Sequence, residues 1–107
     1  MVHGRLEVSH ESDGPIVKLT VEGDLDFTSA DDLRKQVEAV RRDRDGNERI
    51  VLDLSGIQYI DSTGLSQLVW AHSEARTNAW ELAIVRPSDP VRFYMERTGL
   101  DRILPVE

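Results

Sequence analysis

The chain has 107 residues, of which 13 are Lys or Arg and 20 are Asp or Glu, so its formal net charge is −7. This is the length of one domain, here residues 1–107, and the acidic charge disfavours binding to nucleic acid or to anionic lipid. The absence of cysteine excludes disulfides, thiolate metal sites and a cysteine nucleophile.

Membrane insertion and export are not expected. The longest wholly apolar runs, such as residues 82–85, are short, whereas about 20 apolar residues are needed to span a bilayer. Residues 1–5 lack the apolar segment of a signal peptide. We therefore expect a cytoplasmic protein that binds neither membranes nor nucleic acid.

The N-terminal part of the chain predicts an antiparallel hairpin. Residues 6–8 alternate between apolar and polar side chains, and residues 16–21 form a second β-rich run. The turn-forming residues 11–15 between these runs are too few for a crossover, so the two strands are expected to pair side by side.

A helix with a clear start is expected next. Ser29 is a suitable N-cap, and Asp32 three residues later completes a sequence similar to a capping box. Residues 45–47, Asp-Gly-Asn, are expected to end this helix. Its apolar face recurs at helical spacing and consists of Ala30, Leu33, Val37 and Val40.

The remaining elements alternate between strand and helix. They are a buried strand at 50–54, a helix from about 62 to 76, a strand at 81–86, a helix from Ser88-Asp89-Pro90 to Gly99, and a short strand at 103–106. The order β-β-α-β-α-β-α-β predicts an α/β fold with a mixed, mostly parallel sheet of about five strands and right-handed crossovers.

Signatures of catalysis are largely missing from the sequence. There is no glycine-rich phosphate loop and no paired-histidine zinc motif. His3, His10 and His72 are dispersed, and His72 is expected to be a structural residue on the apolar side of its helix. The serine-hydrolase elbow is also excluded, because Ile60 stands where that motif needs glycine.

The passage from the strand at 50–54 to the helix near Ser62 is the most informative segment. Asp61 is placed as an N-cap, and Gly64 in the first turn would let another surface approach the backbone closely. An acid pair of Asp53 and Asp61 is one interpretation, but a strand-terminal acid and a helix cap is favoured. From the local sequence alone, we expect the Ser62 hydroxyl to be exposed and the segment to be an ordinary helix cap.

Three sequence blocks resemble one family. Residues 52–57, Leu-Asp-Leu-Ser-Gly-Ile, followed by residues 60–65, Ile-Asp-Ser-Thr-Gly-Leu, resemble the hallmark of STAS domains, specifically bacterial anti-sigma factor antagonists. Residues 23–34 are similar to the first block of that family, and residues 86–101 to its third. The three blocks occur in the family's order and cover nearly the whole chain.

The resemblance implies a STAS fold and a non-enzymatic switch without a cofactor or a metal. In this family the unmodified protein binds an anti-sigma factor that is also a serine kinase, and so frees the sigma factor. Phosphorylation, carried over here to Ser62, abolishes binding, and a serine phosphatase restores it. A monomer or weak dimer is expected, with a partner-binding surface formed by Asp24, Asp26, Asp61, Thr63, Gly64, Leu65 and Ser66.

Some positions depart from the family pattern. Ser66 stands where glycine is frequent, residues 78–80 replace a glycine-rich turn with Trp80 as a turn cover or partner contact, and many relatives continue beyond Val106. One alternative is a STAS scaffold in a stress-sensing assembly or a lipid transporter. A small enzyme that uses Asp53, Asp61 and Ser62 is the other, and it is disfavoured because no phosphate-cradling loop is present.

Overall fold

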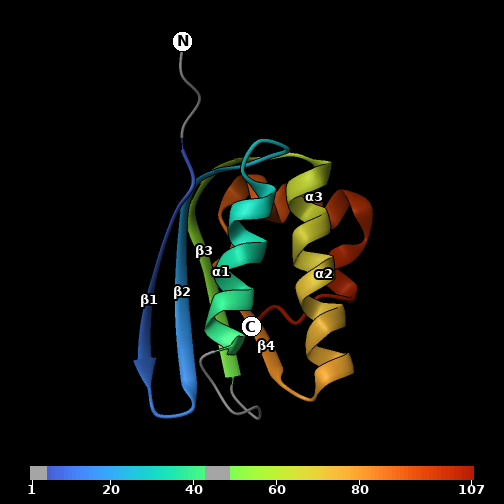
Figure 1. Ribbon diagram of the computed structural model, residues 1–107. Coiled ribbons are helices and arrows are strands. Elements are labelled where there is room, and N and C mark those ends of the chain that lie inside the picture. Colours follow the sequence, from blue (N-terminus) through green and yellow to red (C-terminus); the bar gives the residue numbers. More distant parts are fainter. Residues whose placement is uncertain (1–4, 43–48) are drawn as a thin grey trace.

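The computed structural model describes residues 5–42 and 49–107 (Figure 1). The expected end of the first helix at residues 45–47 lies outside the described residues. Within them, no helix combines the length and the apolar character needed to cross a bilayer. The elements follow in the order β1 (Glu7–Asp13), β2 (Ile16–Leu25), α1 (Ala30–Arg42), β3 (Arg49–Ile60), α2 (Ser62–Asn78), β4 (Glu81–Val85), α3 (Asp89–Thr98) and the 3₁₀ turn η1 (Leu100–Arg102).

The described strands form one sheet in the order β1-β2-β3-β4. β1 and β2 are antiparallel, which confirms the predicted hairpin, and β2, β3 and β4 run parallel to one another. α1 and α2 lie side by side against one face of the sheet (Figure 1). α3 begins beside β3, where the Ser88 N–H donates a hydrogen bond to the Leu54 carbonyl. The result is the predicted mixed, mostly parallel α/β fold.

The core lies between the sheet and the helices. Alternate residues of β2 point into it, as the period of two in a strand requires, and their neighbours on β3 and β4 do the same. The predicted apolar face of α1 is confirmed, because all four of its residues are buried. The central members of this cluster are Val17, Leu19, Val21, Leu33, Val37, Ile50, Leu52, Leu68 and Ile84.

β3 is longer than the sequence predicts. The expected strand ended near Leu54, but β3 continues to Ile60 and pairs with the end of β2, and Ile57 and Ile60 are both buried. The register shifts between Thr20 and Glu22 and again between Gly23 and Asp24. Such bulges interrupt the alternation of buried and exposed residues, so the second half of the strand resembles a loop in sequence. Asp61 alone separates β3 from α2.

The expected fifth strand at residues 103–106 is reduced to a single bridge. Gly99 adopts a left-handed conformation with φ 76° and ends α3, and the chain then forms η1. Val106 bridges Ile84 in parallel, through hydrogen bonds that the Ile84 N–H donates to Pro105 and the Glu107 N–H donates to Ile84. Pro105 has no N–H to extend a ladder, so the predicted strand count was one too high among the described residues.

Candidate functional site

Ser62 is the first residue of α2 and is exposed to solvent. Thr63 and Ser66 are exposed as well, so the first five residues of the helix present three hydroxyl-bearing side chains. The Ser66 hydroxyl donates a hydrogen bond of 2.9 Å to the Ser62 backbone carbonyl, whereas no hydrogen bond within the described residues engages the Ser62 hydroxyl. The placement that the sequence predicts for Ser62 is therefore confirmed.

The Asp61 carboxylate fastens the start of α2 to the loop between β2 and α1. Its Oδ1 accepts a hydrogen bond of 2.9 Å from the Gly64 N–H, which confirms the predicted N-cap. Its Oδ2 accepts a hydrogen bond of 3.0 Å from the N–H of Phe27, a residue 34 positions earlier. Because both oxygens are occupied, Asp61 couples two segments that are distant in the sequence.

Gly64 and Leu65 lie beneath this surface rather than on it. Both are buried, and Leu65 is 4% exposed. A Cβ atom on Gly64 would lie 2.1 Å from the carbonyl oxygen of Leu25 at the end of β2. The close approach expected at Gly64 is therefore made by the protein's own chain, and not by an outside surface.

The loop between β2 and α1 is held by its own side chains. Asp26 Oδ1 accepts hydrogen bonds from the Thr28 hydroxyl at 2.6 Å and the Thr28 N–H at 2.9 Å. The hydrogen bond from the Thr28 hydroxyl is the main cause of a lowered pKa at Asp26. The Ser29 hydroxyl donates to the Asp24 carbonyl at 2.6 Å and accepts from the Asp26 N–H at 3.0 Å. The predicted Ser29–Asp32 capping box is therefore wrong, because the Ser29 hydroxyl turns back into the loop.

A cleft of about 430 Å³ lies next to Asp61, where the ends of β2 and β3 meet this loop. The sequence predicted that Asp24 and Asp26 would lie near Asp61, and all three line the cleft, but the sequence reasoning missed Phe27, Thr28 and Tyr59. The sequence offers one signal for the two aromatic residues. Each lies next to an acidic motif, in a stretch that shows neither strand nor helix periodicity.

The cleft is acidic and partly aromatic. Asp24 is only 9% exposed, and none of the described residues donates a hydrogen bond or an ion pair to its carboxylate. Phe27 is 76% exposed and Tyr59 is 53% exposed. No Lys or Arg lines the cleft, and no group of three or more His, Cys, Asp or Glu side chains is placed to hold a metal ion in the described part of the chain. The cleft therefore presents uncompensated negative charge beside open aromatic rings.

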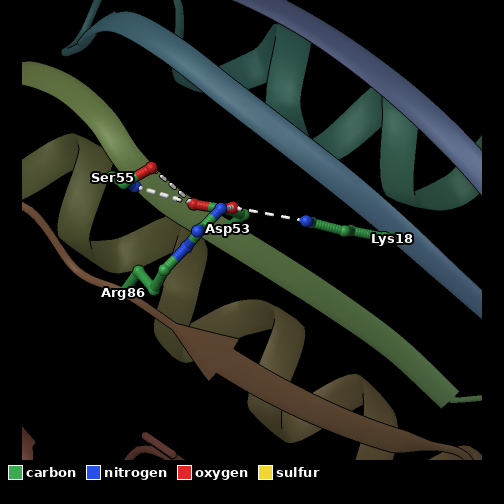
Figure 2. Close-up of polar contacts among 4 residues, drawn as sticks. All are labelled: Lys18, Asp53, Ser55 and Arg86. Carbon is green, nitrogen blue, oxygen red and sulfur yellow. Dashed lines mark hydrogen bonds and ion pairs between the residues drawn. The ribbon is translucent and has the colours of Figure 1, made fainter.

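Asp53 forms a separate polar cluster in the middle of β3 (Figure 2). Its carboxylate is 1% exposed, and its Oδ1 accepts hydrogen bonds from the Ser55 N–H at 3.0 Å and the Ser55 hydroxyl at 2.8 Å. Its Oδ2 pairs with Lys18 at 3.6 Å and with Arg86. Asp53 and Asp61 have no partner in common, so the structure does not support an acid pair, and Asp53 is not the strand-terminal acid that was favoured.

These contacts keep Asp53 ionised in the folded protein. Burial alone would raise the pKa of Asp53, but the hydrogen bonds from Arg86 and Ser55 outweigh it and lower the pKa to about 2. A buried carboxylate with this many donors has a structural role: it joins the middle of β3 to β2 through Lys18 and to the end of β4 through Arg86.

Asp53 is expected to make the protein sensitive to acid. The pKa of Asp53 is about 2 in the folded state, compared with 3.8 for an unperturbed carboxyl. The ionised carboxylate therefore stabilises the fold fully above about pH 4–5, and this stabilisation is lost as the pH falls toward about 2. The difference corresponds to about 2 kcal/mol. In urea unfolding, the free energy of unfolding of the wild type should fall over this pH range by about that much more than the free energy of unfolding of Asp53→Asn. Asp31→Asn, which alters an exposed carboxylate, is the control and should behave like the wild type. Equal losses in the wild type and in Asp53→Asn would contradict this assignment.

Comparison with known proteins identifies the family to which this chain is similar. The STAS domain family model matches residues 7–107. The anti-sigma F factor antagonist of Paenibacillus polymyxa is 31% identical over 103 residues, which are 95% of this chain and 85% of that protein.

Two solved structures share the fold. An anti-sigma factor antagonist from Mycobacterium paratuberculosis has a TM-score of 0.80 at 24% identity, with 94% of this chain and 84% of that chain covered. The Bacillus cell fate determinant SpoIIAA in its phosphorylated form has a TM-score of 0.71 at 17% identity, with 94% and 89% covered. Because the family model spans nearly the whole sequence and the fold agrees, this chain belongs to the STAS domain family.

Proposed function

We propose that this protein is an anti-sigma factor antagonist whose binding to a serine-kinase anti-sigma factor is abolished by phosphorylation of Ser62. The observation that carries the proposal is the exposed Ser62 at the first position of α2, beside an acidic cleft that contains Asp24, Asp26 and Asp61. The name of the Paenibacillus relative supports the role, and the phosphorylated form of SpoIIAA supports the modification.

The fold itself should tolerate a phosphate at Ser62. A phosphoserine carries about −1.5 to −2 charges at neutral pH. At the N-terminus of a helix, unpaired N–H groups and the helix dipole stabilise negative charge by about 0.3 to 2 kcal/mol. Ser62 occupies such a position and is exposed, so phosphorylation should leave the domain folded.

A bound partner should not tolerate the same group. The cleft beside Ser62 is acidic, and residues 5–42 and 49–107 place no basic side chain in its lining and no hydrogen-bond donor on the Asp24 carboxylate. A complementary partner would therefore present Lys or Arg opposite the cleft, with Asp24 available to receive one. A phosphate at Ser62 instead falls where the partner has to meet a small neutral hydroxyl, and the adjacent Asp61 repels it. A charge desolvated without a partner costs several kcal/mol. Removal of the phosphate by a serine phosphatase would restore binding.

Mapping the modified residue tests the proposal. The purified chain is incubated with ATP and the serine-kinase anti-sigma factor of the same organism, and the phosphorylated residue is identified by peptide mass spectrometry. Phosphate is expected on Ser62, none is expected in Ser62→Ala, and Ser73→Ala, which alters an exposed serine further along α2, should be modified like the wild type. Phosphate on Thr63 or Ser66 with Ser62 unmodified would refute the proposed switch.

A further inference from the structure

Three of the six large aromatic rings of the described residues each have an Arg guanidinium stacked on them. The Arg34 guanidinium lies 4.5 Å from the centre of the Trp70 ring, and the Arg41 guanidinium lies 5.1 Å from that of Trp80. On α3, the Arg97 guanidinium lies 5.0 Å from the centre of the Phe93 ring, which remains 57% exposed. Such stacking shields aromatic surface and adds a cation–π attraction.

Among the described residues no Arg or Lys stacks on Phe27, Tyr59 or Tyr94, and Phe27 and Tyr59 differ from Tyr94 because they line the cleft next to Asp61. Both rings line the same cleft, and they remain 76% and 53% exposed. Single exposed aromatic residues are ordinary on protein surfaces, but two uncovered rings in one concave site are typical of a contact surface.

The backbone that carries these rings is held in place. The Phe27 N–H donates to Asp61 Oδ2 at 3.0 Å, and the next residue, Thr28, is held by two hydrogen bonds to Asp26. Tyr59 belongs to β3 and is paired with Asp24 of β2. Because little backbone freedom remains to be lost, burying these rings against another protein would cost mainly the rotamer entropy of the two side chains.

We propose, on the basis of the function proposed above, that Phe27 and Tyr59 are the main source of affinity for the anti-sigma factor. The occupant is a partner surface with apolar side chains at its centre and Lys or Arg at its border. The apolar part matches the two rings, and the basic border matches the three carboxylates of the cleft, in whose lining the described part of the chain places no Lys or Arg. Affinity and regulation are then divided between neighbouring residues: the rings hold the partner, and Ser62 decides whether it can approach.

Ring truncation tests this division of roles. The dissociation constant for the purified serine-kinase anti-sigma factor is measured for the wild type and for Phe27→Ala, Tyr59→Ala and Tyr59→Phe. Each alanine variant is expected to bind about 30-fold more weakly or worse, as is usual for a hot spot, and Tyr59→Phe, which keeps the ring, should stay within about threefold. Phe93→Ala, which removes a ring 57% exposed on α3, should bind like the wild type, and circular dichroism confirms that each variant is folded.

The kinase reaction gives a second readout. Ring truncation should raise the KM for the chain as a substrate and leave kcat nearly unchanged, because Ser62 itself is intact. If both alanine variants bind as tightly as the wild type while the wild type is phosphorylated on Ser62, the rings are not the source of affinity and the proposed function still stands. If the wild type neither binds nor is phosphorylated, the function itself is wrong. A wild type that dimerises in sedimentation while Phe27→Ala stays monomeric would assign the rings to a second copy and overturn the inference.

Discussion

Gly64→Ala is expected to destabilise the protein by about 3 kcal/mol. Alanine is intrinsically better than glycine inside a helix by about 1 kcal/mol, so helix propensity alone predicts the opposite sign. The added Cβ, however, would lie 2.1 Å from the carbonyl oxygen and 2.8 Å from the carbonyl carbon of Leu25, which are backbone atoms of a buried strand. Neither α2, fastened through Asp61, nor β2 can move freely to relieve the clash, and overpacking of this kind costs about 1 to 3 kcal/mol or occasionally more.

Urea unfolding at neutral pH measures this effect. Ser66→Ala alters an exposed residue in the same helical turn and should change the free energy of unfolding by less than about 0.5 kcal/mol. If Gly64→Ala proves as stable as the wild type, the contact between the first turn of α2 and the end of β2 is looser than the structure shows.

Replacing Ser62 should change partner binding far more than stability. Phosphorylation is expected to weaken the complex roughly 10²- to 10³-fold, which corresponds to about 3 to 4 kcal/mol. Ser62→Asp carries a smaller charge and should weaken binding about tenfold or more. The same variant should leave the free energy of unfolding unchanged or raise it by up to about 1 kcal/mol, because the new carboxylate lies at the start of a helix.

Two neutral variants separate charge from size. Ser62→Ala should bind the kinase whether or not ATP is present, and Ser62→Asn, which has the shape of aspartate without its charge, should bind much more tightly than Ser62→Asp does. Titration calorimetry against the purified anti-sigma factor compares all of these proteins. If Ser62→Asn and Ser62→Asp bind equally weakly, the partner responds to bulk rather than to charge, and the electrostatic account of the switch is wrong.

Features encoded by neighbouring residues could be predicted from the sequence. The turn predicted at residues 11–15 indicated the β1–β2 hairpin, although the structure extends β1 to Asp13 and leaves only residues 14–15 in the turn. Helical spacing predicted the buried face of α1. Asp61 was recognised as a cap because its partner, the Gly64 N–H, is three residues away. In each case the interacting groups lie within one turn or one hairpin, so the pattern is visible in a short stretch of sequence.

Features that depend on distant residues could not be predicted in this way. Asp61 also binds the N–H of Phe27, 34 residues away, and Asp53 binds Arg86, 33 residues away. Neither contact has a local sequence signal, and the cleft with Tyr59 exists only because these segments meet. The second half of β3 was likewise not predicted, because the bulges between β2 and β3 make its pattern of buried and exposed residues irregular.

The short passage from β3 to α2 has a consequence for enzymes that would modify Ser62. A 12-residue strand ends at Ile60, and the helix starts two residues later. Many protein kinases bind a flexible peptide substrate in an extended groove. Here, however, regular secondary structure holds the chain on both sides of the acceptor hydroxyl. A matching kinase or phosphatase must therefore be shaped to the intact domain, so recognition would depend on the native three-dimensional surface and would disappear in a short peptide of the same sequence.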